Sequence, residues 1–167
     1  KEYGISVKVV RNISDFNLPK TVQTKRELGL PEDKYIVIMQ GAGINVDRGA
    51  EEMIEAIQLI ENAVLIFVGD GDVIPALKEK VALNAWQEKV LFFGKRSYDE
   101  LMNFTMLSDI GVSLDKDTNI NYRFSLPNKL FDFIHAGVPV VVSNLKEVAN
   151  IVKLHEVGLV TASHDVA

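Results

Sequence analysis

The sequence contains no cysteine, which excludes disulfide bonds and thiolate metal sites. It also contains no apolar run close to the ~20 residues that a membrane-spanning helix needs, and no signal peptide opens the chain. The net charge of −5 argues against a surface that binds nucleic acid through bulk electrostatics. We therefore expect a cytoplasmic protein with no nucleic-acid partner, although the net charge does not exclude a local cluster of basic residues.

Several catalytic and cofactor motifs are absent as well. The histidines at 135, 155 and 164 show no metal-ligand spacing, and no Ser-His-Asp arrangement can be argued. Neither the dinucleotide pattern G-x-G-x-x-G nor the phosphate-loop pattern G-K-[ST] occurs. The stretch Asp115-Lys116-Asp117 matches the acidic D-x-D pattern of a metal-binding site, but we interpret it as a solvated loop. We expect no metal and no cofactor.

What the sequence does contain is an alternation of short apolar runs with longer helical patterns. Strands are expected at 35–40, 63–69, 89–94, 109–114, 138–143 and 158–161. Helices are expected over 48–61, 72–85, 97–108, from about Pro127 to Ala136, and over 145–155, and Ser97 with Glu100 predicts a capping box. Strands that are apolar throughout and separated by helices indicate an α/β fold, a doubly wound parallel sheet of Rossmann-like type.

Residues 1–34 differ from the rest, and we interpret them as a linker with edge elements that leads into a domain over 35–167. The stretch 7–12, VKVVRN, fits either an edge strand or an incoming linker. The stretch 18–33 looks like a short helix between prolines. Because the first residue is Lys1, we also expect a piece of a longer protein.

Ligands of doubly wound sheets bind at the carboxyl ends of the strands. The first loop there, 41–48, has Gly41 and Gly43, which let the backbone approach a ligand closely. Arg48 stands at the start of a helix, where an anion is already favoured. A flexible turn with a solvated arginine explains this loop equally well.

The next loop is a Gly-Asp-Gly turn formed by Gly69, Asp70 and Gly71. A tight connection with Asp72 as helix N-cap explains it without a ligand, and we favour that interpretation when the loop is taken alone.

The third loop exposes Lys95 and Arg96 after Gly94 at the carboxyl edge of the sheet. Two basic side chains there suit a phosphate or a base carbonyl, although most such pairs are merely solvated.

A stronger signal lies in YRFSLPNKLFDFIHAGVPVVVS (122–143), where a helix begins directly before a buried strand. The amides around Ser125 and Asn128 point outward from the helix start, and Lys129 adds a charge suited to phosphate. Asp132, one helical step further, could accept hydrogen bonds from a ribose diol. Phosphate binders beside a carboxylate suit a sugar nucleotide, whereas an ordinary capped helix with an Asp–Lys pair is the plainer alternative. His135 is expected to interact with the helix dipole.

Five segments then match one family in order: VVRNISDF (9–16), QGAGINVDRG (40–49), LIFVGDG (65–71), VLFFGKRSYDEL (90–101) and SLPNKLFDFIHAGVPVV (125–141). Together they cover nearly the whole chain, which resembles the C-terminal, donor-binding domain of glycosyltransferases with the two-domain GT-B architecture. Within that architecture it resembles retaining family 4, the glycosyl transferases group 1. The resemblance implies that the chain binds a nucleotide-sugar donor.

The resemblance also implies roles for individual residues. Arg48 and Lys129 would contact the donor diphosphate and carry catalysis, and Asp132 would hold the nucleotide ribose. The segment from Gly94 to Arg96 would border the base. The remaining positions at the nucleotide and donor sugar would be Gly41, Gly43, Gly69, Gly71, Ser125 and Asn128.

Three departures from the family pattern bear on the donor sugar. Ala42 stands where many members have arginine. The first glutamate of the family's E-x7-E motif falls on Phe124, and the second is shortened to Asp132. These changes leave the nucleotide site intact and put the contacts to the sugar in doubt.

The function that the resemblance implies is sugar transfer from a nucleotide-sugar to an acceptor, with retention and without a metal. In GT-B enzymes the acceptor is held by an N-terminal domain, so that domain is the expected partner and the present chain alone is expected to be inactive. Peripheral membrane association of a full-length enzyme is not visible in this sequence. A non-catalytic binding or interaction module with the same fold is the alternative, and a related epimerase or phosphorylase is a third option.

Overall fold

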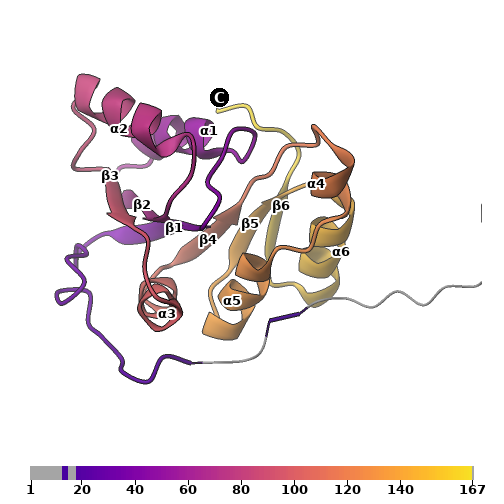
Figure 1. Ribbon diagram of the computed structural model, residues 1–167, viewed down its shortest axis with the longest axis horizontal. Coiled ribbons are helices and arrows are strands. Elements are labelled where there is room, and N and C mark those ends of the chain that lie inside the picture. The colour runs from indigo at the N-terminus through magenta and orange to yellow at the C-terminus, as the bar shows by residue number, and fades with distance from the viewer. Residues whose placement is uncertain (1–12, 15–17, 167) are drawn as a thin grey trace, which may run out of the picture.

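The computed structural model of the chain describes residues 13–14 and 18–166, and its centre is a parallel six-stranded sheet (Figure 1). The strand order is β3-β2-β1-β4-β5-β6. The strands are β1 (Tyr35–Gly41), β2 (Ala63–Gly69), β3 (Val90–Gly94), β4 (Ile110–Ser113), β5 (Val140–Ser143) and β6 (Gly158–Thr161). The helices are α1 (Ala50–Ala56) with a 3-10 extension (Ile57–Leu59), α2 (Ile74–Leu83), α3 (Tyr98–Met106), α4 (Ile120–Phe124), α5 (Asn128–Ala136) and α6 (Lys146–His155). The doubly wound, Rossmann-like α/β fold predicted from the sequence is confirmed.

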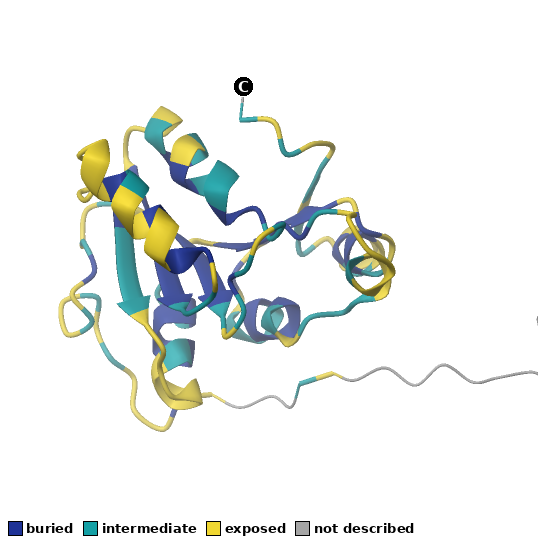
Figure 2. Cartoon of the chain, turned by 45° about the horizontal axis from the view of Figure 1, so that its top comes forward, coloured by how far each residue is buried: buried dark blue, intermediate teal, exposed yellow. Residues whose placement is uncertain are grey.

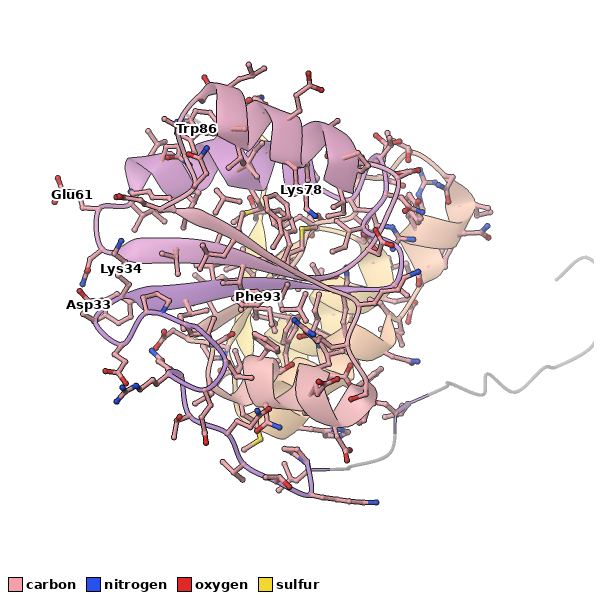
Figure 3. All side chains as sticks on the ribbon, turned by 60° about the vertical axis from the view of Figure 1, so that its left-hand side comes forward. Asp33, Lys34, Glu61, Lys78, Trp86 and Phe93 are labelled. Carbon is pink, nitrogen blue, oxygen red and sulfur yellow. The ribbon has the colours of Figure 1, made fainter. Side chains whose placement is uncertain are left out.

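Each face of the sheet carries its own core, because alternate strand residues point to opposite sides. Val37 and Met39 pack with α1 and α2, whereas Ile36 and Ile38 pack with α3, α5 and α6. Figure 2 shows the buried strands between helices whose outer faces are exposed. Figure 3 shows Lys78 and Phe93 on opposite faces of the same sheet. Burial on both faces explains why the strands are apolar throughout.

All six predicted strands and five predicted helices are confirmed to within about two residues. The capping box is confirmed as well, because the Ser97 amide donates to the Glu100 carboxylate at 3.0 Å and the Ser97 hydroxyl accepts from the Glu100 amide at 3.4 Å. Pro127 is the N-cap of α5, with φ −71° and ψ 141°. His135 lies in the last turn of α5, as expected.

Two local predictions are wrong. The segment 18–33 forms no helix but a hydrogen-bonded turn over residues 25–29, in which Leu30 donates to the Lys25 carbonyl at 2.8 Å. Asp72 does not cap α2, whose N-cap is Val73. Its carboxylate instead accepts a hydrogen bond from the Val46 amide at 3.0 Å, so it ties two loops together. The stretch 7–12, expected as an edge strand or linker, lies outside the described residues.

The strand order reverses between β1 and β4, since β2 and β3 extend the sheet on one side and β4 to β6 on the other. The crevice outside the carboxyl ends of two such strands is the usual ligand site of this fold. Figure 1 shows α5 against β4 and β5, and α4 beside α6. Arg48 follows β1 and Asp115 follows β4, so both lie at the reversal.

Candidate functional site

An ion pair between Arg48 and Asp115 spans the reversal point of the sheet. The guanidinium nitrogen Nη1 of Arg48 lies 3.2 Å from each carboxylate oxygen of Asp115. Asp115 is buried, with 5% of its side chain exposed, whereas 25% of the Arg48 side chain is exposed. Because a buried carboxylate needs a partner, Asp115 fixes where the guanidinium lies.

Lys129 reaches the same carboxylate from the first turn of α5. Its Nζ lies 3.9 Å from Asp115 Oδ1, and 13% of its side chain is exposed. Burial lowers the pKa of Lys129, the Asp115 carboxylate opposes that shift, and the Arg48 guanidinium adds to it. The structure therefore brings together the two cations for which the family resemblance implies a contact with the donor diphosphate.

The prediction that the stretch 115–117 is a solvated loop is wrong for Asp115. Its carboxylate is buried between two cations, while Asp117 is exposed and pairs with Arg123 at 2.9 Å. The available signal was position, because Asp115 comes directly after the carboxyl end of β4. Sequence alone did not show which loops would face it.

Two further features fix the position of Arg48, a contact with an aromatic ring and the close packing of the residue that follows it. Its guanidinium carbon lies 4.6 Å above the ring of Tyr122, on the short helix α4 that the sequence analysis did not predict. The residue after it, Gly49, has φ 79° and packs so closely on Leu114 that a Cβ there would lie 2.5 Å from the Leu114 Cβ. Only glycine combines this backbone conformation with this approach. It brings the loop after β1 against the loop after β4.

The start of α5 lies beside these charges with its first amides free of a side-chain cap. Pro127 provides none, and Ser125 ends α4 while Asn128 begins α5. The approach of α5 to the sheet depends on Gly111 in β4, where a Cβ would lie 2.6 Å from the Phe133 ring. The helix start therefore faces the site with the positive end of its dipole.

The glycines of the second loop have a packing role that the sequence did not reveal. A Cβ at Gly69 would lie 1.8 Å from the Gly41 carbonyl oxygen, and one at Gly71 would lie 1.9 Å from that of Ile44. The loop 69–72 thus lies directly against the loop 41–48. Both glycines explain how the first loop is held, and any contact between them and a ligand stays a prediction.

Gly43 and Gly94 are different because both have open space around them. The nearest atom to a Cβ at Gly43 would be 3.6 Å away, in the side chain of Asn45. No atom lies within 4 Å of a Cβ at Gly94, whose φ of 67° favours glycine. Their backbones are accessible, as a close approach by a ligand requires.

Lys95 and Arg96 do not act as a pair in this structure. Lys95 lies 3.5 Å from the Asp70 carboxylate and lines a pocket of 260 Å³ together with Lys78. Arg96 lines a separate pocket of 180 Å³ with Glu100. The two basic side chains expected to share one ligand therefore lie at two different hollows.

Asp132 is buried beneath a tyrosine that the sequence analysis did not single out. The Tyr98 hydroxyl donates to Asp132 Oδ1 at 3.0 Å, and 41% of Tyr98 is exposed. Burial raises the pKa of Asp132, and the hydrogen bond from Tyr98 partly offsets this. Burial and the Asp132 carboxylate raise the pKa of Tyr98 to about 12, so the phenol stays a donor at neutral pH. The carboxylate is thus an acceptor that a hydroxyl group can satisfy.

Comparison with known proteins assigns the chain to a family. The sequence profile of the family described as glycosyl transferases group 1 matches residues 21–167. This chain belongs to that glycosyltransferase family. A curated relative is the chitobiosyldiphosphodolichol beta-mannosyltransferase of Candida glabrata, 25% identical over 134 residues, which cover 74% of this chain and 29% of the relative.

Solved structures of glycosyltransferases share the fold of this family member. Anabaena Alr3699/HepE, solved in complex with UDP-glucose, matches with a TM-score of 0.71 and 20% identity over 92% of this chain and 43% of its own. Sucrose-phosphate synthase from Thermosynechococcus elongatus matches with a TM-score of 0.66 and 19% identity over 85% of this chain and 36% of its own. The glycosyltransferase domain described here spans less than half the length of each of these proteins.

The part of the chain that the structure describes has neither a metal-binding cluster nor a membrane-spanning helix. Within residues 13–14 and 18–166, no group of three or more His, Asp or Glu side chains is placed to hold a metal ion. None of the helices in this described part is long and apolar enough to cross a bilayer. The expectations of a metal-free site and a cytoplasmic location stay predictions.

Proposed function

We propose that this chain is the donor-binding, C-terminal half of a GT-B glycosyltransferase of retaining family 4. The observation that carries the proposal is the convergence of Arg48 and Lys129 at the carboxyl ends of β1 and β4, beside the start of α5. Two cations and a helix N-terminus suit the diphosphate of a nucleotide-sugar. The complex of the structurally similar Alr3699/HepE with UDP-glucose supports this class of donor.

The proposed reaction breaks the bond between the anomeric carbon of the sugar and an oxygen of the diphosphate. The anomeric carbon forms a new bond to a hydroxyl oxygen of the acceptor, whose proton passes to the leaving diphosphate. The electron pair of the broken bond moves to the leaving diphosphate, where negative charge builds up. Arg48 and Lys129 stabilise this charge, because they are fixed before the reaction begins. The fixed cations make a metal unnecessary in this scheme.

The nucleoside lies on the side of α3 and α5 in this proposal. Asp132 accepts a hydrogen bond from a ribose hydroxyl, the kind of bond that the Tyr98 hydroxyl donates to it. The backbones at Gly41, Gly43, Ser125 and Asn128 approach the phosphates and sugar, and the loop 94–96 borders the base. An N-terminal domain supplies the acceptor, so we expect the 167-residue chain to bind donor without transferring sugar.

Calorimetric titration with UDP, GDP and ADP tests the proposal. We expect saturable binding of one nucleotide, weakened at least about tenfold by Lys129→Ala because a buried charge beside the phosphates is lost. Lys153→Ala is the matched control, since Lys153 is an exposed lysine of α6. A thermal melt of each variant shows whether it is folded. Failure of all three nucleotides to bind, or equal affinities of folded Lys129→Ala and wild type, would contradict the proposal.

One observation favours a second candidate, a non-catalytic binding module. Phe124, at the position of the family's first glutamate, is 49% exposed and packs beneath Lys146 Nζ at 5.4 Å. A phenyl ring cannot accept hydrogen bonds from sugar hydroxyls, so this contact to the donor sugar is missing. Equal affinities for a nucleoside diphosphate and all its sugar conjugates would support the module, whereas preference for one sugar conjugate would support the transferase.

A further inference from the structure

Asp115 is a buried carboxylate that faces two cations from different parts of the chain. Arg48 comes from the loop after β1 and Lys129 from α5, and both side chains meet the carboxylate of Asp115 within 4.0 Å. We propose that Asp115 is a positioning residue, the built-in counter-ion of the phosphate site: it holds Arg48 and Lys129 side by side and keeps Lys129 charged until donor phosphates take over its contacts. The identity of the displacing ligand rests on the proposed function.

The neighbouring acids have other partners, which leaves this role to Asp115. Asp117 pairs with Arg123, and Glu52 pairs with Lys116. Among the described residues, Asp115 and Arg48 are the charged groups that shift the proton equilibrium of Lys129. Asp115 is therefore the anion that balances the charges of Arg48 and Lys129.

The two cations depend on that anion in different ways. Arg48 depends on Asp115 for its position, because its Nη1 contacts both carboxylate oxygens at 3.2 Å. Lys129 is a buried amine beside a second positive charge, and both conditions lower its pKa, while Asp115 raises it. Removal of the Asp115 charge must therefore lower the pKa of Lys129 further and release its proton at a lower pH.

This dependence gives Asp115→Asn a signature that simple loss of structure would not produce. The substitution keeps the size of the side chain and removes its charge. At alkaline pH the variant must take up a proton on Lys129 when a nucleoside diphosphate binds, since the phosphates then supply the missing negative charge. The wild type, in which Asp115 supplies this charge, should take up fewer protons than the variant on binding.

The test is calorimetric titration with the nucleotide that the wild type binds, from about pH 7.5 to about pH 9.5, above the range where a terminal phosphate titrates. Two buffers with different ionisation enthalpies report the protons exchanged. We expect the affinity of Asp115→Asn to fall by up to about tenfold per pH unit once Lys129 titrates, with matching proton uptake. Asp117→Asn, which removes the neighbouring exposed charge, should behave as wild type. A flat pH profile for Asp115→Asn, without proton uptake, would overturn the proposal.

A second measurement needs no nucleotide and separates this inference from the proposed function. The NMR shift of the Lys129 side-chain Cε, followed through a pH titration, gives the pKa of the amine in the wild type and in Asp115→Asn. A lower pKa in Asp115→Asn supports the counter-ion role even if no nucleotide binds, a result that would contradict only the proposed function. An unchanged pKa in the folded variant would overturn the counter-ion role even if nucleotide binding is confirmed.

Discussion

At the scale of single residues, the candidate site contains charges that are costly to bury alone. Asp115 is buried against the partly buried side chains of Arg48 and Lys129, and Asp132 is buried beneath the Tyr98 hydroxyl. Perturbed ionisable groups of this kind cluster where a protein binds or transforms a ligand, although structural ion pairs also produce them. Asp132 allows the cost of such burial to be measured separately from ligand binding.

Asp132→Asn should make the protein more stable at neutral pH. Burial raises the pKa of Asp132 above its ordinary value, so the folded protein binds this proton more readily than the unfolded chain. Wild-type stability therefore falls as pH rises from the ordinary carboxyl pKa through the raised one. An asparagine avoids this loss and can still accept a hydrogen bond from the Tyr98 hydroxyl.

Urea unfolding at about pH 7 and about pH 3.5 checks this prediction, since the lower pH lies near the ordinary carboxyl pKa. The free energy of unfolding of Asp132→Asn should exceed that of the wild type at the higher pH, and the gap should shrink at the lower one. Asp33→Asn, at an exposed aspartate before β1, is the control. If Asp132→Asn is less stable than the wild type at neutral pH, burial of the Asp132 carboxylate does not destabilise the protein and the prediction is wrong.

A site residue could be predicted from the sequence where its place in a helix or strand was the signal, and not where its role depends on contacts between distant segments. Arg48 and Lys129 could be placed at helix starts from the sequence, because the beginning of a helical pattern is a local signal. The buried role of Asp115 and the contact of Tyr98 with Asp132 depend on which loops and helices face each other. No local pattern encodes that arrangement, so those two residues were misread or missed.

At the scale of elements, the two loops after β1 and β2 form one packed unit. The Ile44 amide donates to the Asp70 carbonyl at 2.9 Å, and the Asp72 amide donates to the Asn45 side chain at 3.2 Å. Gly71 permits this contact, whereas Gly43 lies in open space. These two glycines of neighbouring loops thus allow packing to be tested against ligand approach.

Gly71→Ala should destabilise the protein by about 1–3 kcal/mol, because its new Cβ would lie 1.9 Å from a carbonyl oxygen and force the loops apart. Gly43→Ala is the matched control, and we expect its stability to stay within about 0.5 kcal/mol of wild type. If the backbone at Gly43 approaches phosphate, the same variant should nonetheless bind nucleotide more weakly. Thermal unfolding and titration of both variants test this, and equal stabilities would refute the packing role of Gly71.

The elements themselves were predictable to the extent that burial shaped their sequence. The central strands β1 and β2 are covered on both faces and are therefore apolar throughout, which located them. The edge strand β6 is only partly buried, but its residues are still apolar enough to be located. The helix expected within 18–33 failed, because Gly29 with φ 70° ends the turn there. The helix α4 has five residues, too few for an amphipathic period to show, and it was missed.

At the scale of the whole molecule, a protein of net charge −5 has Arg48 and Lys129 together at one edge of its sheet. Fold topology produces this arrangement by bringing the ends of β1 and β4 and the start of α5 to one edge of the sheet. The alternating pattern predicted that edge, and the family match over residues 21–167 agrees with it. In the proposed function, the identity of the donor sugar and of the acceptor depends on contacts beyond this edge. The relatives of this chain are longer than the chain itself.

A crystal structure of the chain with a bound nucleoside diphosphate would show directly where the phosphates lie. We predict phosphate oxygens within hydrogen-bond distance of the Arg48 guanidinium and Lys129 Nζ, with the ribose against Asp132. A nucleotide bound elsewhere, such as in the pocket lined by Lys78 and Lys95, would contradict the proposed function, because the cations at the reversal of the sheet would then not be its phosphate site.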